Sequence, residues 1–140
     1  MEAEDAARRE HEIGLGLFVV PERRVRFRDS LENPRRRKKL HHELYHFERR
    51  LDSRFARRHA PHTKYDGHVE QVLELLRKKG APPSCFVMAD IDLDGQEAEL
   101  GQAVEALMLS GAGFISCVPG CLGLYVSEDG SNVFVLERDA

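Results

Sequence analysis

The sequence is poor in cysteine, in long apolar runs and, over its second half, in basic residues. Three cysteines are an odd number, and Cys117 and Cys121 flank a turn sequence that would set them on opposite faces of a hairpin, so reduced thiols are expected. The apolar run from Ile13 to Val20 is too short to span a bilayer. The chain opens Met-Glu-Ala-Glu-Asp, which has the wrong charge for a secretory signal. We therefore expect a soluble, cytoplasmic protein without a membrane partner.

Basic residues are almost absent from residues 81–140, which carry one Lys or Arg against ten Asp or Glu. Residues 1–80 carry 20 basic and 14 acidic side chains, so the two parts have net charges of −9 and +6. Residues 21–64 alone contain 15 basic and six acidic side chains, together with five of the seven His. This density of positive charge predicts an anionic partner, which is either an anionic macromolecule or an acidic protein surface.

The length and the apolar content set the domain organisation. A chain of 140 residues, 41% of them apolar, can bury one core, so we expect one compact domain. Its parts are a frayed N-terminal segment (1–20), a basic helical region (21–80) and an acidic α+β region (81–140). Residues 2–12 have almost no apolar face, and a frayed helix or disorder is expected there.

Helical periodicity dominates the basic region. Residues 23–28 alternate like a strand, but Pro21 and the spacing of the nearby apolar residues favour a helix. Asn33-Pro34 predicts the start of a helix that runs to about Arg50, and after a loop another amphipathic helix ends before Gly80. The apolar stripes that support these two helices are Leu40, Leu44, Phe47 and Leu51, and Tyr65, Val69, Val72, Leu73 and Leu76.

The acidic region combines a helix with strands. Residues 85–91 indicate a buried strand, and Asp94 with Glu97 resembles a capping box that starts a helix. Three strands follow, joined by Pro119-Gly120 and Asp129-Gly130 turns, at residues 114–118, 122–126 and 133–136. The expected fold is α+β, in which the N-terminal amphipathic helices and the crossover helix all pack over one face of a small mixed sheet. The order along the acidic region is strand, helix and then a three-strand meander.

The pentapeptide His42-Glu43-Leu44-Tyr45-His46 has the H-E-x-x-H pattern and resembles the zinc-binding helix of zincin metalloproteases. The resemblance covers five residues and implies that His42 and His46 bind zinc and that Glu43 is the general base, with Asp52 at the place of a third ligand. It departs from the longer metzincin pattern at Arg49, where that pattern has Gly. A zinc-dependent hydrolase is therefore an alternative function, although both imidazoles project onto a cationic helix face.

A second pattern is Asp90-Ile91-Asp92-Leu93-Asp94-Gly95, which reproduces the opening of an EF-hand calcium loop. The twelfth position is Gly101 instead of the closing Glu. Asp94 is more simply an N-cap, and Asp90 and Asp92 fit the end of a strand. A ligand- or cation-sensing domain that uses these three carboxylates is a further alternative.

The basic helical face is the preferred candidate site. Five consecutive cations at residues 35–39 cannot all pair with acids one helical turn away, since only Glu43 is correctly placed for Lys39. The sequence has no recognisable nucleic-acid-binding module, so the prediction of a nucleic-acid partner depends on the charge distribution alone. Docking of this face on the acidic half, within the chain or across a homo-oligomer, is also open. We expect a non-enzymatic binding protein without a cofactor, whose anion-binding residues are Arg35, Arg36, Lys39, Arg49 and Arg50.

Overall fold

Helices occupy most of residues 2–50 and the strands follow, an arrangement that confirms the α+β class. The computed structural model describes residues 2–59, 68–127 and 132–138. None of the described helices is long and apolar enough to cross a membrane. The elements are α1 (Glu2–Leu15), η1 (Gly16–Phe18), η2 (Pro21–Arg23), α2 (Arg24–Glu32), α3 (Pro34–Glu43), η3 (Leu44–His46), η4 (Glu48–Arg50), β1 (Ala56–His59), α4 (His68–Lys78), β2 (Ser84–Ala89), β3 (Glu97–Glu99), α5 (Leu100–Ser110), β4 (Gly113–Val118), β5 (Leu122–Val126) and β6 (Val133–Glu137), where η marks a 3₁₀ turn.

The described strands form one six-stranded sheet in the order β1-β6-β5-β4-β2-β3. The predicted meander of β4, β5 and β6 is confirmed, but every neighbouring pair is antiparallel, so the expected mixed sheet is wrong. The reason is that α5 leaves the edge strand β3 and returns to β4, which lies antiparallel beside β2. Strand β1 falls in the predicted loop after Asp52, and it pairs with β6 with Ala56 opposite Leu136.

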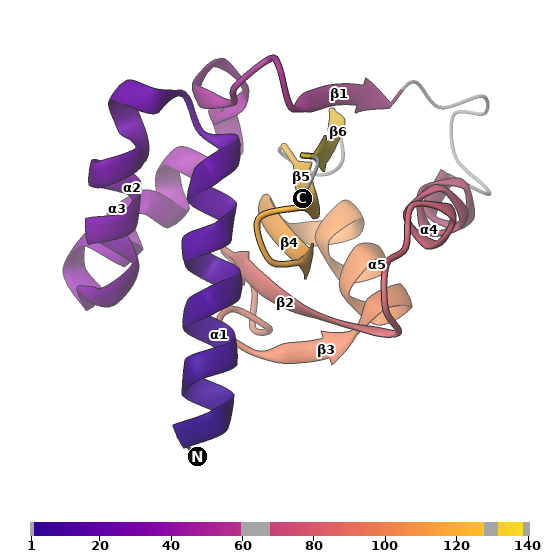
Figure 1. The fold of residues 1–140 in the computed structure, drawn as a ribbon, viewed down its shortest axis with the longest axis horizontal. Coiled ribbons are helices and arrows are strands. Elements are labelled where there is room, and N and C mark those ends of the chain that lie inside the picture. Colours follow the sequence, from indigo (N-terminus) through magenta and orange to yellow (C-terminus); the bar gives the residue numbers. More distant parts are fainter. Residues whose placement is uncertain (1, 60–67, 128–131, 139–140) are drawn as a thin grey trace.

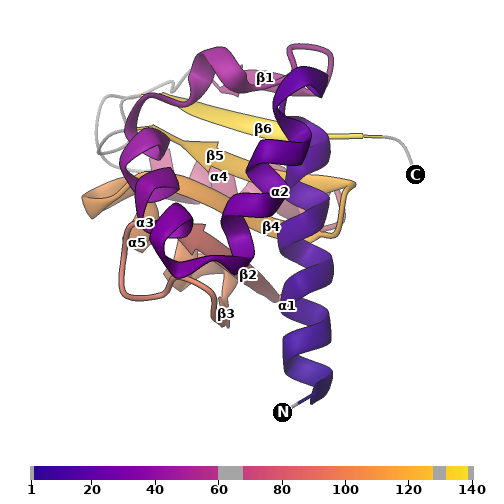
Figure 2. The ribbon, with the colours of Figure 1, turned by 90° about the vertical axis from the view of Figure 1, so that its left-hand side faces the viewer.

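Helices cover both faces of the sheet (Figure 1). Helices α1, α2 and α3 lie over one face, as Figure 2 shows from their side, and α4 and α5 lie over the other. Successive strand residues point to opposite faces, so Ile115 and Leu124 join the core under α4 and α5, whereas Phe114 and Tyr125 join the core under α1 to α3. The expectation that all helices pack on one face is wrong, because the strands are apolar on both faces.

The second half of α1 packs closely on the sheet, which the sequence did not indicate. Leu15 is buried, and His11 stacks on Phe86 with ring centroids 4.5 Å apart. The helix also approaches the turn between β4 and β5 at Gly14, where a Cβ would lie 2.4 Å from the backbone nitrogen of Gly120. Only glycine permits this approach, so α1 is held by shape as well as by apolar contacts.

The predicted helix from Asn33 to Arg50 begins where expected and keeps its apolar stripe buried, but it ends as an α-helix at Glu43. The hydroxyl of the buried Tyr125 accepts a hydrogen bond from the backbone N–H of Phe47 at 2.9 Å and donates one to the carbonyl of Leu44 at 2.5 Å. These two backbone groups therefore do not form regular α-helical hydrogen bonds, and two 3₁₀ turns follow α3 instead.

The helix predicted after Asp94 is present, but its start is different. Residues 97–99 form β3, and the N-cap of α5 is Glu99, whose carboxylate accepts a hydrogen bond from the N–H of Gln102 at 2.6 Å. The capping-box prediction is wrong because Asp94 already accepts a hydrogen bond from the N–H of Ala89, at 3.0 Å, inside the loop between β2 and β3. The predicted turn at Asp129-Gly130 lies outside the described residues.

The cysteines are free thiols, as expected. Cys85 and Cys117 are buried in the core under α4 and α5, and this burial raises the pKa of each thiol to about 12. Both thiols are therefore protonated at neutral pH and pack as small apolar groups.

Candidate anion-binding groove

A groove of about 540 Å³ lies between α2 and α3, the two helices joined at Asn33. Residues of η2 and α2 line one side, and residues of α3 and of the segment that follows it line the other. Its lining residues are Glu22, Arg23, Val25, Arg26, Phe27, Asp29, Ser30, Arg36, Lys39, Leu40, Glu43, Phe47 and Arg50. We call this feature the α2–α3 groove.

Helical spacing explains which side chains face the groove. Arg36, Lys39 and Glu43 are three and four residues apart, so they share one face of α3. Beneath the polar side chains lie the buried rings of Phe27 and Phe47, which meet edge to face with their centroids 6.1 Å apart. The groove therefore has a rigid aromatic base and a charged rim.

The rim carries more positive than negative charge, with five Arg or Lys side chains against three carboxylates. Glu43 forms an ion pair with Arg50 at 2.5 Å, and not with Lys39 as its helical spacing suggested. The guanidinium of Arg50 also lies over the ring of Phe47, 5.7 Å from its centroid. The other four rim cations, Arg23, Arg26, Arg36 and Lys39, have no ion-pair partner among the described residues.

Three of the five predicted anion-binding residues line the groove, namely Arg36, Lys39 and Arg50. Arg35 is exposed at the start of α3 and does not belong to the lining. Arg49 lines a separate hollow with His46 and Glu48. The structure thus divides the predicted basic face into a groove, an exposed helix start and a neighbouring hollow.

The sequence prediction missed the α2 side of the groove. Arg23 and Arg26 line it together with Val25, whose side chain is 73% exposed. The available signal was the spacing of Arg23 and Arg26, three residues apart, in the segment already favoured as a helix. The strand-like alternation of residues 23–28 made it uncertain which of these side chains share a face.

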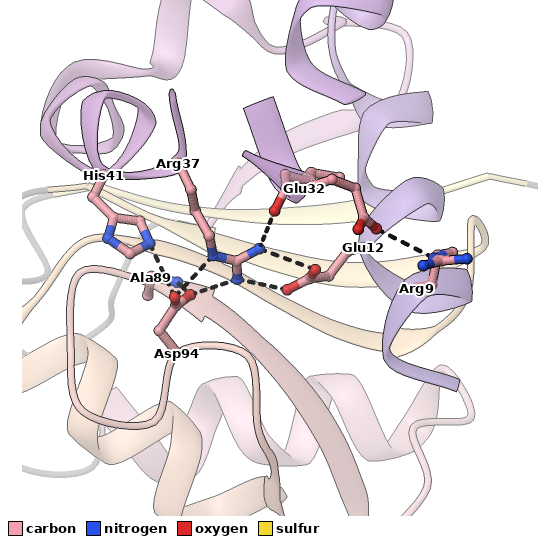
Figure 3. A network of polar contacts seen from close by, with 8 residues as sticks. Arg9, Glu12, Glu32, Arg37, His41, Ala89 and Asp94 are labelled. Atoms are coloured by element: carbon pink, nitrogen blue, oxygen red, sulfur yellow. Dashed lines mark hydrogen bonds and ion pairs between the residues drawn. The ribbon is translucent and has the colours of Figure 1, made fainter. Parts of the chain in front are cut away.

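Arg37 is the cation of the basic run that turns inward (Figure 3). Its guanidinium donates to Glu12 of α1 at 2.6 and 3.1 Å and to Asp94 of the β2–β3 loop at 2.9 and 3.0 Å. Burial opposes its positive charge, but the hydrogen bonds to the two carboxylates prevail and raise the pKa of Arg37. His41 Nε2 lies 3.1 Å from the same carboxylate of Asp94. Arg37 therefore anchors α3, which presents its other cations to solvent.

The first turn of α3 is closed to anions. The side-chain oxygen of Asn33 accepts hydrogen bonds from the N–H groups of Arg35 at 3.0 Å and Arg36 at 3.2 Å. The N–H of Arg37 is bonded to the Asn33 carbonyl at 2.8 Å. Because these amides already have acceptors, an anion at this helix must be bound by side chains.

The structure does not bring the three proposed zinc ligands together. Helix α3 ends one residue after His42, so His42 and His46 do not share a continuous α-helix, and both are exposed. Asp52 is buried, and hydrogen bonds from Arg54 hold the pKa of its carboxyl below the usual range. Among residues 2–59, 68–127 and 132–138, no group of three or more His, Cys, Asp or Glu side chains is arranged to hold a metal ion.

Two of the three carboxylates of the predicted cation-sensing loop contact side chains of α3 and of the turn after it. Asp94 binds Arg37, and Asp90 accepts a hydrogen bond from the hydroxyl of Tyr45 at 2.7 Å. Asp92 is exposed, and its backbone carbonyl accepts from the side chain of Gln96 at 3.1 Å. The loop therefore makes protein contacts instead of forming a converging set of oxygen ligands.

Comparison of this chain with protein-family models, with curated proteins and with solved structures finds no match.

Proposed function

We propose that this chain is a non-enzymatic binding protein that uses the α2–α3 groove to contact an anionic macromolecule. The observation that carries the proposal is the set of rim cations without an ion-pair partner among the described residues. Exposed cations of α2, α3 and η4 extend this charge beyond the groove and also have no ion pair among the described residues: Arg28, Arg35, Lys38 and Arg49. Like charges this close repel one another, and an anionic partner relieves that repulsion.

The chemistry of the groove favours binding over proton transfer. In the described chain, the groups with shifted pKa values are core thiols, a core hydroxyl, a half-buried imidazole, and the members of the Arg37–Asp94 and Asp52–Arg54 ion pairs. None of these groups lines the groove. Catalytic acids and bases are usually found among such perturbed groups, whereas the groove offers guanidinium and ammonium groups that bind phosphate or carboxylate by charge-assisted hydrogen bonds.

Fluorescence anisotropy with two labelled polyanions, polyglutamate and an oligonucleotide, tests the proposal across a salt series. The groove variant is Arg36→Glu with Lys39→Glu, and the matched control is Arg57→Glu with Arg58→Glu on β1, which has the same charge change on exposed residues outside the lining. At least one polyanion should bind more weakly as salt rises. With the oligonucleotide, the expected slope corresponds to roughly four to six neutralised phosphates.

The groove variant should lose at least about tenfold in affinity, while the control keeps most of it. Equal losses in the two variants would show that net charge matters and the groove does not. Absence of binding to both polyanions at low salt would refute the proposal.

A further inference from the structure

We infer that the occupant of the α2–α3 groove is an acidic amphipathic α-helix from another protein, an inference that rests on the proposed function. Its carboxylates would pair with the rim cations Arg26, Arg36 and Lys39. Its apolar side chains would cover Val25. This is the helix-in-groove mode of recognition, in which apolar anchors recur every three or four residues.

The shape of the groove suits a helix. Its two sides are themselves helices, and its rim combines cations with an exposed apolar residue, which is the pairing that an acidic amphipathic helix requires. Val25 is an apolar side chain that is 73% exposed in the middle of a cationic rim. Contact with a partner's apolar side chain removes this surface from water, whereas a purely ionic partner leaves it exposed.

Three observations favour a protein helix over nucleic acid. The aromatic rings at the base, Phe27 and Phe47, are 3% and 2% exposed, so they provide no platform for stacking bases. The rim includes the exposed carboxylates of Glu22 and Asp29. A helix can have uncharged residues beside these two carboxylates, whereas a phosphate backbone carries a charge at every nucleotide. The first amides of α3 are bonded to Asn33 and do not offer a phosphate contact.

A second copy of this chain is a poorer occupant. The exposed carboxylate of Glu105 belongs to α5, which covers the face of the sheet opposite to α2 and α3 (Figure 1). Docking of α5 in the groove of the next copy would be head to tail and would not close into a two-fold dimer. The groove is therefore assigned to a different protein.

The test uses a labelled 20-residue peptide in which Leu recurs at helical spacing among Glu residues. The matched control peptide has the same composition in scrambled order, so it has the same charge but no apolar stripe. A labelled oligonucleotide is the third probe. The full chain is titrated with each probe, alongside the groove variant, the β1 control variant and Val25→Ala, and circular dichroism verifies that every variant is folded.

The amphipathic peptide should bind at least about tenfold more tightly than the scrambled peptide and should lose this affinity in the groove variant. Val25→Ala should weaken the amphipathic peptide by about three- to tenfold and leave the scrambled peptide unchanged, because it removes only apolar contact. Equal affinity for the two peptides overturns the inference and leaves the proposed function standing. Tighter groove-dependent binding of the oligonucleotide does the same and identifies nucleic acid as the partner. Absence of groove-dependent binding to all three probes overturns both.

Discussion

Replacement of Arg37 by Met should destabilise the protein far more than any change on the exposed part of the basic run. The Arg37 side chain is only 14% exposed and makes four hydrogen bonds to Glu12 and Asp94. At about 1.5–3 kcal/mol each, four bonds to charged groups would give roughly 6–12 kcal/mol. That sum is too large, because the charges also lose water when they are buried. Removal of one partner from a buried ion pair costs about 3–5 kcal/mol, and we expect this range for Arg37→Met.

Urea unfolding monitored by far-ultraviolet circular dichroism measures this effect, since the chain has no Trp to report on unfolding. The control is Arg36→Met, the exposed neighbour, which should change the free energy of unfolding by less than about 0.5 kcal/mol. Restoring neutrality by adding Glu12→Gln and Asp94→Asn to Arg37→Met should recover part of the loss. Equal effects of the Arg37 and Arg36 variants would refute the assignment of Arg37 as the anchor of α3.

The same network predicts a pH dependence. Burial of Asp94 favours its neutral form, but hydrogen bonds from His41 and Arg37 outweigh burial and lower the pKa of this carboxyl. The stabilisation is therefore present above the unfolded pKa of about 3.9 and is lost as the pH falls through the lower folded pKa. The difference between the wild-type protein and Arg37→Met should shrink in acid, and a difference that grows in acid would contradict the network.

Three further predictions concern the packing of the sheet. Tyr125→Phe leaves a buried N–H and a buried carbonyl unpaired and should lower the free energy of unfolding in urea by about 1–3 kcal/mol. The control Tyr45→Phe removes an exposed hydrogen bond and should cost less than about 0.5 kcal/mol. Similar costs would contradict this role of the Tyr125 hydroxyl. Gly14→Ala drives a Cβ against the Gly120 backbone and should destabilise by about 1–3 kcal/mol, and an unchanged Tm would show that α1 does not pack there. Burial lowers the pKa of His11, so the contribution of this side chain to stability is present above about pH 6.5 and is lost as the pH falls. In His11→Gln the free energy of unfolding should therefore depend less on pH between about pH 7 and pH 5. An unchanged pH dependence would refute this.

Local signals in the sequence were sufficient for most elements of the fold. The apolar runs of the meander predicted β4, β5 and β6, and Asn33-Pro34 predicted the start of α3. What failed depended on distant contacts. The early end of α3 coincides with the hydrogen bonds that the Tyr125 hydroxyl makes to Leu44 and Phe47, and β1 pairs with the edge of the distant strand β6. Neither contact leaves a periodic pattern in the chain.

The candidate site was predictable in its charge but not in its geometry. The count of cations between residues 21 and 64 pointed to the segment that contains the α2–α3 groove, and Arg36, Lys39 and Arg50 line that groove. Composition cannot tell which member of a run of five cations faces inward. The burial of Arg37 depends on carboxylates of α1 and the β2–β3 loop, which are brought to it only by the folded chain.

The most direct test of the central claim is an NMR titration of the isotope-labelled protein with polyglutamate and, separately, with an oligonucleotide. Binding in the α2–α3 groove predicts that the largest amide shift changes fall in residues 22–30 and 36–50 for at least one polyanion, and that these changes disappear in the Arg36→Glu, Lys39→Glu variant. Shift changes that are largest at the other exposed cations, on β1 or at the end of α4, or that are equal over the whole surface, would contradict the claim that the groove is the binding site.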